Sequence, residues 1–138
     1  MKKRVLFLCT GNSCRSQMAE GWLRHLGGDR CEVFSAGTRP QGVNPLAVRV
    51  MAEAGVDLSS HRSKSVNDFL GRDLDLLVTV CGGAKESCPV FLGTVGDRRH
   101  WALADPAKAR GSEEEVLKVF RRVRDEIRTR VEAFLQEG

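Results

Sequence analysis

The stretch VLFLCTGNSCRS (residues 5–16) is the part of the sequence from which the fold can be inferred. Its first four residues are an apolar run typical of a short buried strand, and the segment QMAEGWL directly after it is typical of the start of a helix. A strand therefore leads into a helix through a tight polar loop. The amides of such a loop and the positive dipole end of the helix together favour binding of a tetrahedral oxyanion.

Two side chains of this loop have complementary chemistry. Arg15 supplies a planar fork of donors for two oxygens of a bound anion. The same positive field favours the thiolate form of Cys9, which makes it a nucleophile aimed at the centre of the anion. Two other interpretations stay open, a buried structural cysteine and half of a zinc site formed with Cys14. The zinc partners would be Cys81 and Cys88, which are spaced more widely than zinc ligands usually are.

Length and composition limit the class of protein. A chain of 138 residues suits one domain, residues 1–138, and the net charge of +4 allows an anionic substrate. Much of the excess arginine is interleaved with Glu and Asp near the C-terminus, as on a solvated helix face, so we expect no nucleic-acid partner. The N-terminal apolar run is too short for a signal core, and no stretch suits a membrane span, so we expect a cytoplasmic protein with no membrane contact. In that compartment the five cysteines are expected to be reduced, and the three histidines show no metal-ligand spacing.

The remaining segments alternate between helix and strand patterns. Strands are expected at residues 31–36 and 74–80, and helices from residue 44 to Gly55 and, more briefly, at residues 66–70. The segment GSEEE opens a long amphipathic helix after residue 111. This alternation predicts an α/β fold, a single-domain, doubly wound, mainly parallel sheet with helices on both faces.

Two further segments carry candidate functional groups. In CGGAKESCP (residues 81–89), Cys81 and Cys88 are joined by a span that begins with two glycines, which suits a disulfide exchanged between successive partners. Two buried cysteines flanking a turn are the other interpretation. Asp105 precedes a proline after an apolar run, where its carboxyl could donate a proton to a leaving oxygen or simply open a turn. Because ligands of such sheets bind beyond the carboxyl ends of strands, we expect Cys9 and Cys81 to be neighbours.

Taken together, the CTGNSCRS loop, the Cys81/Cys88 pair followed by Pro89, and the Asp105-Pro106 dipeptide resemble the thioredoxin-coupled arsenate reductases. These enzymes are built on the low-molecular-weight protein tyrosine phosphatase fold. The resemblance extends over essentially the whole chain, and the combination is far more specific than any single motif.

The resemblance implies reduction of arsenate to arsenite, with phosphate or sulfate as analogues of the substrate. Ser16 would hydrogen-bond the Cys9 thiolate, Cys9 would attack arsenic, and Asp105 would protonate the departing oxygen. The loop residues implied to hold the oxyanion are Thr10, Gly11, Asn12, Ser13, Cys14 and Arg15.

The resemblance also implies a relay of three cysteines. Cys81 would attack Cys9 and release arsenite, and Cys88 would then attack Cys81. Thioredoxin would reduce the resulting disulfide, so that no tightly bound cofactor is expected, and the protein would act as a monomer. Cys14 has no required role in this scheme.

One position departs from the family pattern. Members that bind a potassium ion near the loop use an asparagine, a glutamate, a serine and a carboxylate. Asn12, Glu20 and Ser35 match the first three, but Lys64 stands at the carboxylate position. We expect the Lys64 ammonium to take the place of the cation and neutralise Glu20, so that no metal is needed.

Two other functions compete with this interpretation. A phosphatase would use Cys9, Arg15 and Asp105 equally well through a phosphocysteine intermediate, but would not need the Cys81/Cys88 pair. A weak phosphatase side activity is therefore expected. A non-catalytic thiol sensor of redox state or metalloids would need a partner or a DNA-reading element, and no helix-turn-helix or basic arm is visible.

Overall fold

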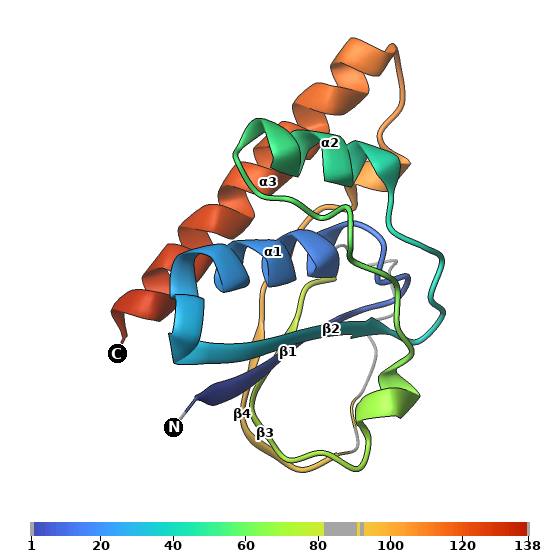
Figure 1. The fold of residues 1–138 in the computed structure, drawn as a ribbon. Helices are drawn as coiled ribbons and strands as arrows, with labels where there is room; N and C mark the ends of the chain where they lie inside the picture. Colours follow the sequence, from blue (N-terminus) through green and yellow to red (C-terminus); the bar gives the residue numbers. More distant parts are fainter. Residues whose placement is uncertain (1, 82–90, 92, 138) are drawn as a thin grey trace.

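A sheet of four parallel strands forms the centre of the molecule (Figure 1). The computed structural model describes residues 2–81, 91 and 93–137. The strands are β1 (Lys3–Cys9), β2 (Cys31–Gly37), β3 (Leu74–Thr79) and β4 (Val95–His100). Their order in the sheet is β2-β1-β3-β4 and every pair is parallel, which confirms the expected parallel α/β sheet. The helices expected on both faces are distributed unequally among the described residues, because the α-helices lie on one face and the short 3-10 helix at residues 66–69 packs on the other. The strand order reverses between β1 and β3, and in such sheets ligands bind at that switch point.

The three α-helices lie on one side of this sheet (Figure 1). They are α1 (Arg15–Gly27), α2 (Pro45–Glu53) and α3 (Glu113–Gln136), and three short 3-10 helices are η1 (Gly28–Arg30), η2 (Val66–Phe69) and η3 (Pro106–Lys108). Helix α1 packs against β2 and α3, and α2 packs against α3. The long C-terminal helix therefore packs beside α1 on the same face of the sheet, and its apolar stripe is buried in this layer.

Side-chain caps explain where several of these helices begin. Asn44 Oδ1 accepts a hydrogen bond from Leu46 N at 2.8 Å, directly before the proline that opens α2. Ser112 Oγ accepts from Glu115 N at 3.2 Å at the start of α3. The helix expected after the loop begins slightly earlier than its sequence suggests, at Arg15, so the Arg15 side chain projects from its first turn.

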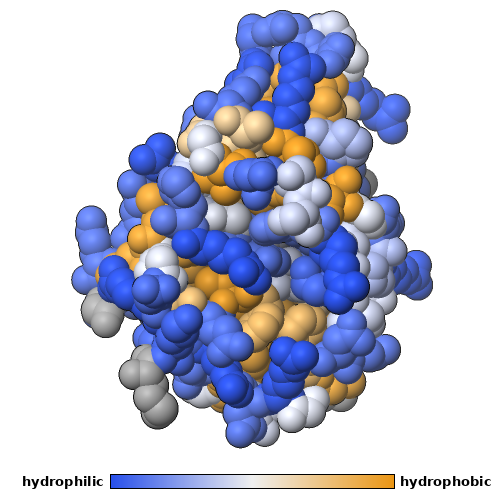
Figure 2. Space-filling view, in the orientation of Figure 1, coloured by the Kyte–Doolittle hydropathy of each residue, from blue (hydrophilic) through white to orange (hydrophobic). Residues whose placement is uncertain are grey.

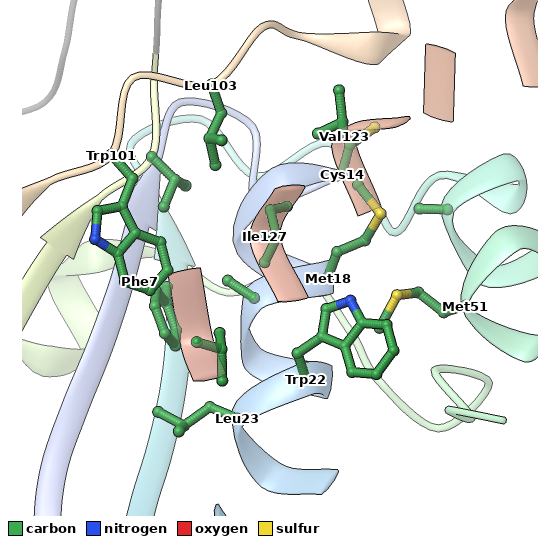
Figure 3. Close-up of a cluster of buried hydrophobic side chains, with 14 of the residues drawn as sticks. Phe7, Cys14, Met18, Trp22, Leu23, Met51, Trp101, Leu103, Val123 and Ile127 are labelled. Atoms are coloured by element: carbon green, nitrogen blue, oxygen red, sulfur yellow. The ribbon is translucent and has the colours of Figure 1, made fainter. Parts of the chain in front are cut away.

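Alternate residues of β1 point to opposite faces of the sheet and bury two apolar clusters. Val5 and Phe7 face the three α-helices, where Trp22 and Met51 complete the larger cluster (Figure 3). Leu6 and Leu8 face the other way, toward a smaller cluster that contains Phe69 of η2 and Phe91. Both faces of the central strand are thus covered, which accounts for its continuous apolar run.

The sequence did not predict strand β4. Its residues, VGDRRH, are largely exposed, and only one edge of the strand pairs, with β3. An edge strand in contact with water lacks the apolar pattern by which buried strands are recognised, and its charges discourage pairing with other chains.

The surface in Figure 2 is mostly hydrophilic, with small apolar patches between charged side chains. Within the described residues, no helix has the length and apolar character needed to cross a bilayer.

Candidate functional site

The loop between β1 and α1 holds the Cys9 thiol in a buried polar pocket. Cys9 Sγ lies 2.9 Å from Ser16 Oγ and accepts a hydrogen bond from the backbone amide of Asn12 at 3.2 Å. The side chain of Cys9 is 3% exposed. Two polar groups therefore converge on the sulfur, the arrangement that hydrogen bonds to an anionic acceptor require.

The loop keeps its shape because other segments hold its carbonyl groups. Arg39 N donates to Thr10 O at 2.9 Å and Asn44 N donates to Ser13 O at 3.1 Å. Gly37, the last residue of β2, lies so close that an added Cβ would be 2.5 Å from Thr10 O and 2.8 Å from Asn12 N. The loop and the end of β2 therefore form one closely packed backbone unit, in which only glycine fits at position 37.

Arg15 and Asp105 meet across the site. Arg15 Nη2 lies 3.7 Å from Asp105 Oδ2, and Arg15 Nη1 donates to Leu103 O at 3.1 Å. Asp105 Oδ1 accepts from Ala107 N at 3.0 Å and so caps η3. One oxygen of Asp105 therefore opens a turn, as one of the two sequence interpretations expects, while the other faces the charged arginine. Proton donation by Asp105 stays a prediction.

The described cysteines differ in state and surroundings. Cys9, Cys14 and Cys31 are free thiols. Cys81 is disulfide-bonded and almost completely buried. It follows β3, where Val80 N donates to Leu8 O at 3.1 Å, so the chain leaves the sheet beside Cys9. The expected partner of Cys81 in the relay, Cys88, lies outside the described residues.

The Cys14 side chain points away from the anion loop and into the apolar cluster, near Met18 (Figure 3). The pKa of Cys14 is raised to about 12, mainly by burial; the hydrogen bond with Ser13 opposes this rise, and the nearby Asp105 carboxylate contributes to it. Cys14 is therefore a neutral packing residue at neutral pH. The sequence analysis listed Cys14 among the loop residues but assigned no required role to its thiol. The position of the thiol in the apolar cluster is consistent with that assignment.

Behind the loop, the buried carboxylate of Glu20 is surrounded by donors and positive charges. Ser35 Oγ donates to Oε1, Arg24 Nε lies 2.9 Å from Oε2, and Lys64 Nζ lies 3.6 Å from Oε1. The His61 ring nitrogen Nδ1 is 3.7 Å from Oε2. Burial lowers the pKa of His61, and the charge of Glu20 opposes this shift only in part.

These contacts bear on whether a potassium ion fits here. Asn12 Oδ1 already accepts hydrogen bonds from Gln17 Nε2 at 3.0 Å and from Lys64 N at 2.9 Å. Glu20 Oε1 is engaged by Ser35 and faced by the Lys64 ammonium. Because oxygens that would bind the cation are occupied by donors and Lys64 supplies the positive charge, the residues present do not fit potassium.

Three residues without a role in the sequence analysis also belong to the site, namely Gln17, His61 and Ser63. Gln17 is fully buried and contacts Asn12, His61 and Arg62. The sequence carries no signal for it, and only the structure shows that the buried polar residues of the described part of the chain cluster here: Asn12, Arg15, Ser16, Gln17, Glu20 and Ser35. None of their polar atoms lacks a hydrogen-bond partner.

Comparison with known proteins agrees with this geometry. The sequence profile of the low molecular weight phosphotyrosine protein phosphatase family matches residues 4–137. An arsenate reductase of Halalkalibacterium halodurans is 50% identical over 137 residues, which cover 99% of this chain and 98% of that protein.

Solved structures show the same similarity. An arsenate reductase in a phosphate-binding state superposes with a TM-score of 0.82 at 35% identity and covers 98% of each chain. A thioredoxin-dependent arsenate reductase of Corynebacterium glutamicum has a TM-score of 0.66 at 25% identity, covering 99% of this chain and 64% of that one.

Proposed function

The chain belongs to the low molecular weight phosphotyrosine protein phosphatase family, and we propose that within this family it is an arsenate reductase regenerated by thioredoxin. Arsenate is a tetrahedral oxyanion, as is the phosphate bound by one of the similar structures. It would occupy the loop of residues 9–16, held by backbone amides and by the Arg15 guanidinium.

The first step is nucleophilic attack of Cys9 on arsenic. The Cys9 thiolate forms a sulfur–arsenic bond while one arsenate oxygen departs, and Asp105 gives that oxygen a proton so that it leaves as water or hydroxide. Asp105 is suited to this role because its Oδ2 faces Arg15, which would hold the same anion. The product is an adduct in which arsenic is still As(V).

The second step is a disulfide exchange that moves two electrons. The Cys81 thiolate attacks Cys9 Sγ, a Cys9–Cys81 disulfide forms, and the electron pair of the sulfur–arsenic bond stays on arsenic, which leaves as arsenite. Cys88 then attacks Cys81 and frees Cys9. Thioredoxin reduces the Cys81–Cys88 disulfide and returns the enzyme to its starting state.

A single observation supports this proposal: Cys9 and Cys81 both lie at the switch point of the sheet, and they differ in oxidation state. Cys9 ends β1, Cys81 follows β3, and these strands are hydrogen-bonded neighbours. Cys9 is free while Cys81 is bonded, which is the state expected once Cys88 has attacked Cys81. Hydrolysis of a phosphomonoester does not need a second cysteine beside Cys9, whereas disulfide exchange requires one.

Phosphomonoester hydrolysis is the second candidate activity, supported by the family profile itself. Phosphate has the shape and charge of arsenate, so Cys9, Arg15 and Asp105 would also form and hydrolyse a phosphocysteine. We propose it as a weak side reaction that needs neither Cys81 nor Cys88.

The test is a pair of assays on the purified protein. Arsenate-dependent NADPH consumption is measured with thioredoxin and thioredoxin reductase, and hydrolysis of p-nitrophenyl phosphate is measured in the same buffer. We expect Cys9→Ser to abolish both activities. Cys81→Ser and Cys88→Ser should stop repeated arsenate turnover and leave ester hydrolysis largely intact.

Cys31→Ser is the matched control, because Cys31 is a free, partly exposed thiol at the start of β2, at the opposite end of that strand from the loop. It should leave both activities unchanged. Brisk ester hydrolysis without arsenate turnover by any thiol donor would reject the reductase and favour the phosphatase. Equal loss of both activities in Cys88→Ser would reject the division of roles.

A further inference from the structure

Asn12 is the residue through which the loop contacts the Cys9 sulfur. Its φ angle of 47° places it in the left-handed region, and in this conformation its amide donates to Cys9 Sγ at 3.2 Å. Its side-chain Nδ2 donates to Ser16 Oγ at 2.8 Å, and Ser16 Oγ lies 2.9 Å from the same sulfur. Whatever holds Asn12 in this position therefore also holds the two donors of Cys9.

The amide of Gln17 provides much of that hold. Its Nε2 lies 3.0 Å from Asn12 Oδ1, 3.3 Å from Asn12 O and 2.9 Å from Arg62 O. These three atoms can only accept hydrogen bonds, so the orientation of the Gln17 amide is determined. Its Oε1 consequently faces His61 Nδ1 at 3.1 Å and accepts the proton carried there.

The direction of every subsequent hydrogen bond follows from this orientation. Asn12 Oδ1 accepts from Gln17 and from Lys64 N, so Asn12 Nδ2 faces Ser16 and donates to it. The only hydrogen of the Ser16 hydroxyl is then left for Cys9 Sγ. The side chains of Gln17, Asn12 and Ser16 thus form a chain in which each group donates toward the sulfur, and bonds in such chains strengthen one another.

We propose that Gln17 is a positioning residue that acts through Asn12 and Ser16 to favour the thiolate form of Cys9. The proposal deepens the proposed function, and it rests on that function only in taking Cys9 as the nucleophile. Gln17 does not touch the substrate site itself. It sets the direction of the donors that reach the sulfur.

The test measures the reactivity of Cys9 without arsenate. The rate of alkylation of Cys9 by iodoacetamide is followed as a function of pH, with the modified peptide identified by mass spectrometry. Gln17→Met keeps the size of the side chain and removes the donor. We expect Cys9 alkylation near neutral pH to slow by roughly threefold to tenfold, the range that corresponds to the loss of one net hydrogen bond, with the reactivity profile displaced to higher pH.

A double-mutant cycle separates this role from a general structural one. In a Ser16→Ala background the side-chain route to Cys9 is cut and only the Asn12 amide still donates to the sulfur, so Gln17→Met should there slow alkylation clearly less than it does in the unmodified protein. An equal slowing in both backgrounds would overturn the proposal, as would unchanged alkylation in Gln17→Met. Gln17→Glu, which retains the shape but puts an oxygen against the three acceptors, is the second variant should Gln17→Met fail to fold.

Ser63→Ala is the control for a purely structural effect. Ser63 Oγ donates to Asn12 O at 2.6 Å but is not part of the series of side-chain hydrogen bonds that leads from Gln17 to Cys9. It should change Cys9 alkylation less than Gln17→Met does, and a larger change would overturn the proposal. The outcome is independent of the reductase assay. A protein that shows the expected alkylation pattern but no arsenate turnover would retain this inference and lose the proposed function.

Discussion

The guanidinium of Arg15 and the carboxylate of Asp105 face each other at 3.7 Å, although Arg15 begins α1 and Asp105 precedes η3. Arg15 is 4% exposed, so its charge needs a partner when no anion is bound. An incoming oxyanion would take over this pairing and be placed next to the carboxyl group. The ion pair therefore positions a carboxyl group beside the proposed anion site.

We expect Asp105→Asn to lower kcat for arsenate reduction by roughly 10²–10⁴-fold, the usual contribution of a general acid. The amide can still accept the hydrogen bond from Ala107 N, so η3 should persist. Steady-state kinetics check the effect. Asp57→Asn is the control, because Asp57 accepts a comparable bond from Ser59 N on the exposed surface, and a similar loss in both variants would contradict the assignment.

Lys64→Met should lower the free energy of unfolding by roughly 1–2 kcal/mol, since it removes one positive charge facing the buried Glu20 carboxylate. The loss stays moderate because Arg24 still contacts Glu20 at 2.9 Å. Urea unfolding in potassium and in sodium chloride measures it, with exposed Lys118→Met as control.

The same experiment tests the replacement of the cation. The unmodified protein should be equally stable in both salts, whereas Lys64→Asp should become more stable in potassium. Greater stability or activity of the unmodified protein in potassium would show that Lys64 does not substitute for the ion.

The Cys14 thiol should make stability fall at alkaline pH. Its folded-state pKa of about 12 exceeds the ordinary value of 9.0, because burial disfavours the charged form. The stabilisation is therefore fully present below pH 9.0 and is lost as pH rises toward 12. Urea unfolding at pH 8 and pH 10.5 should show a steeper decline for the unmodified protein than for Cys14→Ala, and parallel declines would contradict it.

Gly37→Ala should damage the anion loop without any change in the loop itself. The new Cβ would lie 2.5 Å from Thr10 O, which is a backbone atom and cannot move aside cheaply. We expect a loss of roughly 1–3 kcal/mol in stability and weaker phosphate binding, measured by calorimetry. Gly71→Ala, where an added Cβ meets nothing within 4 Å, is the control and should leave phosphate affinity unchanged.

Local patterns predicted much of the fold. The apolar run before Cys9 became β1, the Asn44-Pro45 pair became the start of α2, and Ser112 became the cap of α3. These features depend on neighbours in sequence, so they can be recognised there. Strand β4 could not, because its exposed residues acquire strand structure only by pairing with β3.

The residues of the candidate site also fall into two groups, those that could be predicted from the sequence and those that could not. Cys9, Arg15 and Ser16 lie within one short motif; the roles of Cys9 and Arg15 are predicted from their chemistry, and the role of Ser16 from the family resemblance. Gln17 and Ser63 gave no signal, because each matters through a contact with Asn12 that exists only when the loop is folded against residues 61–64. A buried polar group is visible as such only in three dimensions.

The sequence by itself determined the nucleophilic loop, the alternation of strands and helices, and the set of thiols, because each depends on residue type and short spacing. The position of Cys81 after a parallel strand also predicted that it would lie beside the end of the Cys9 strand, and the pairing of β1 with β3 places it there. Tertiary structure alone decided that the path of the chain after β4 brings Asp105 to Arg15. Such meetings depend on strand order and on the burial of both sheet faces, which are properties of the whole chain rather than of any segment.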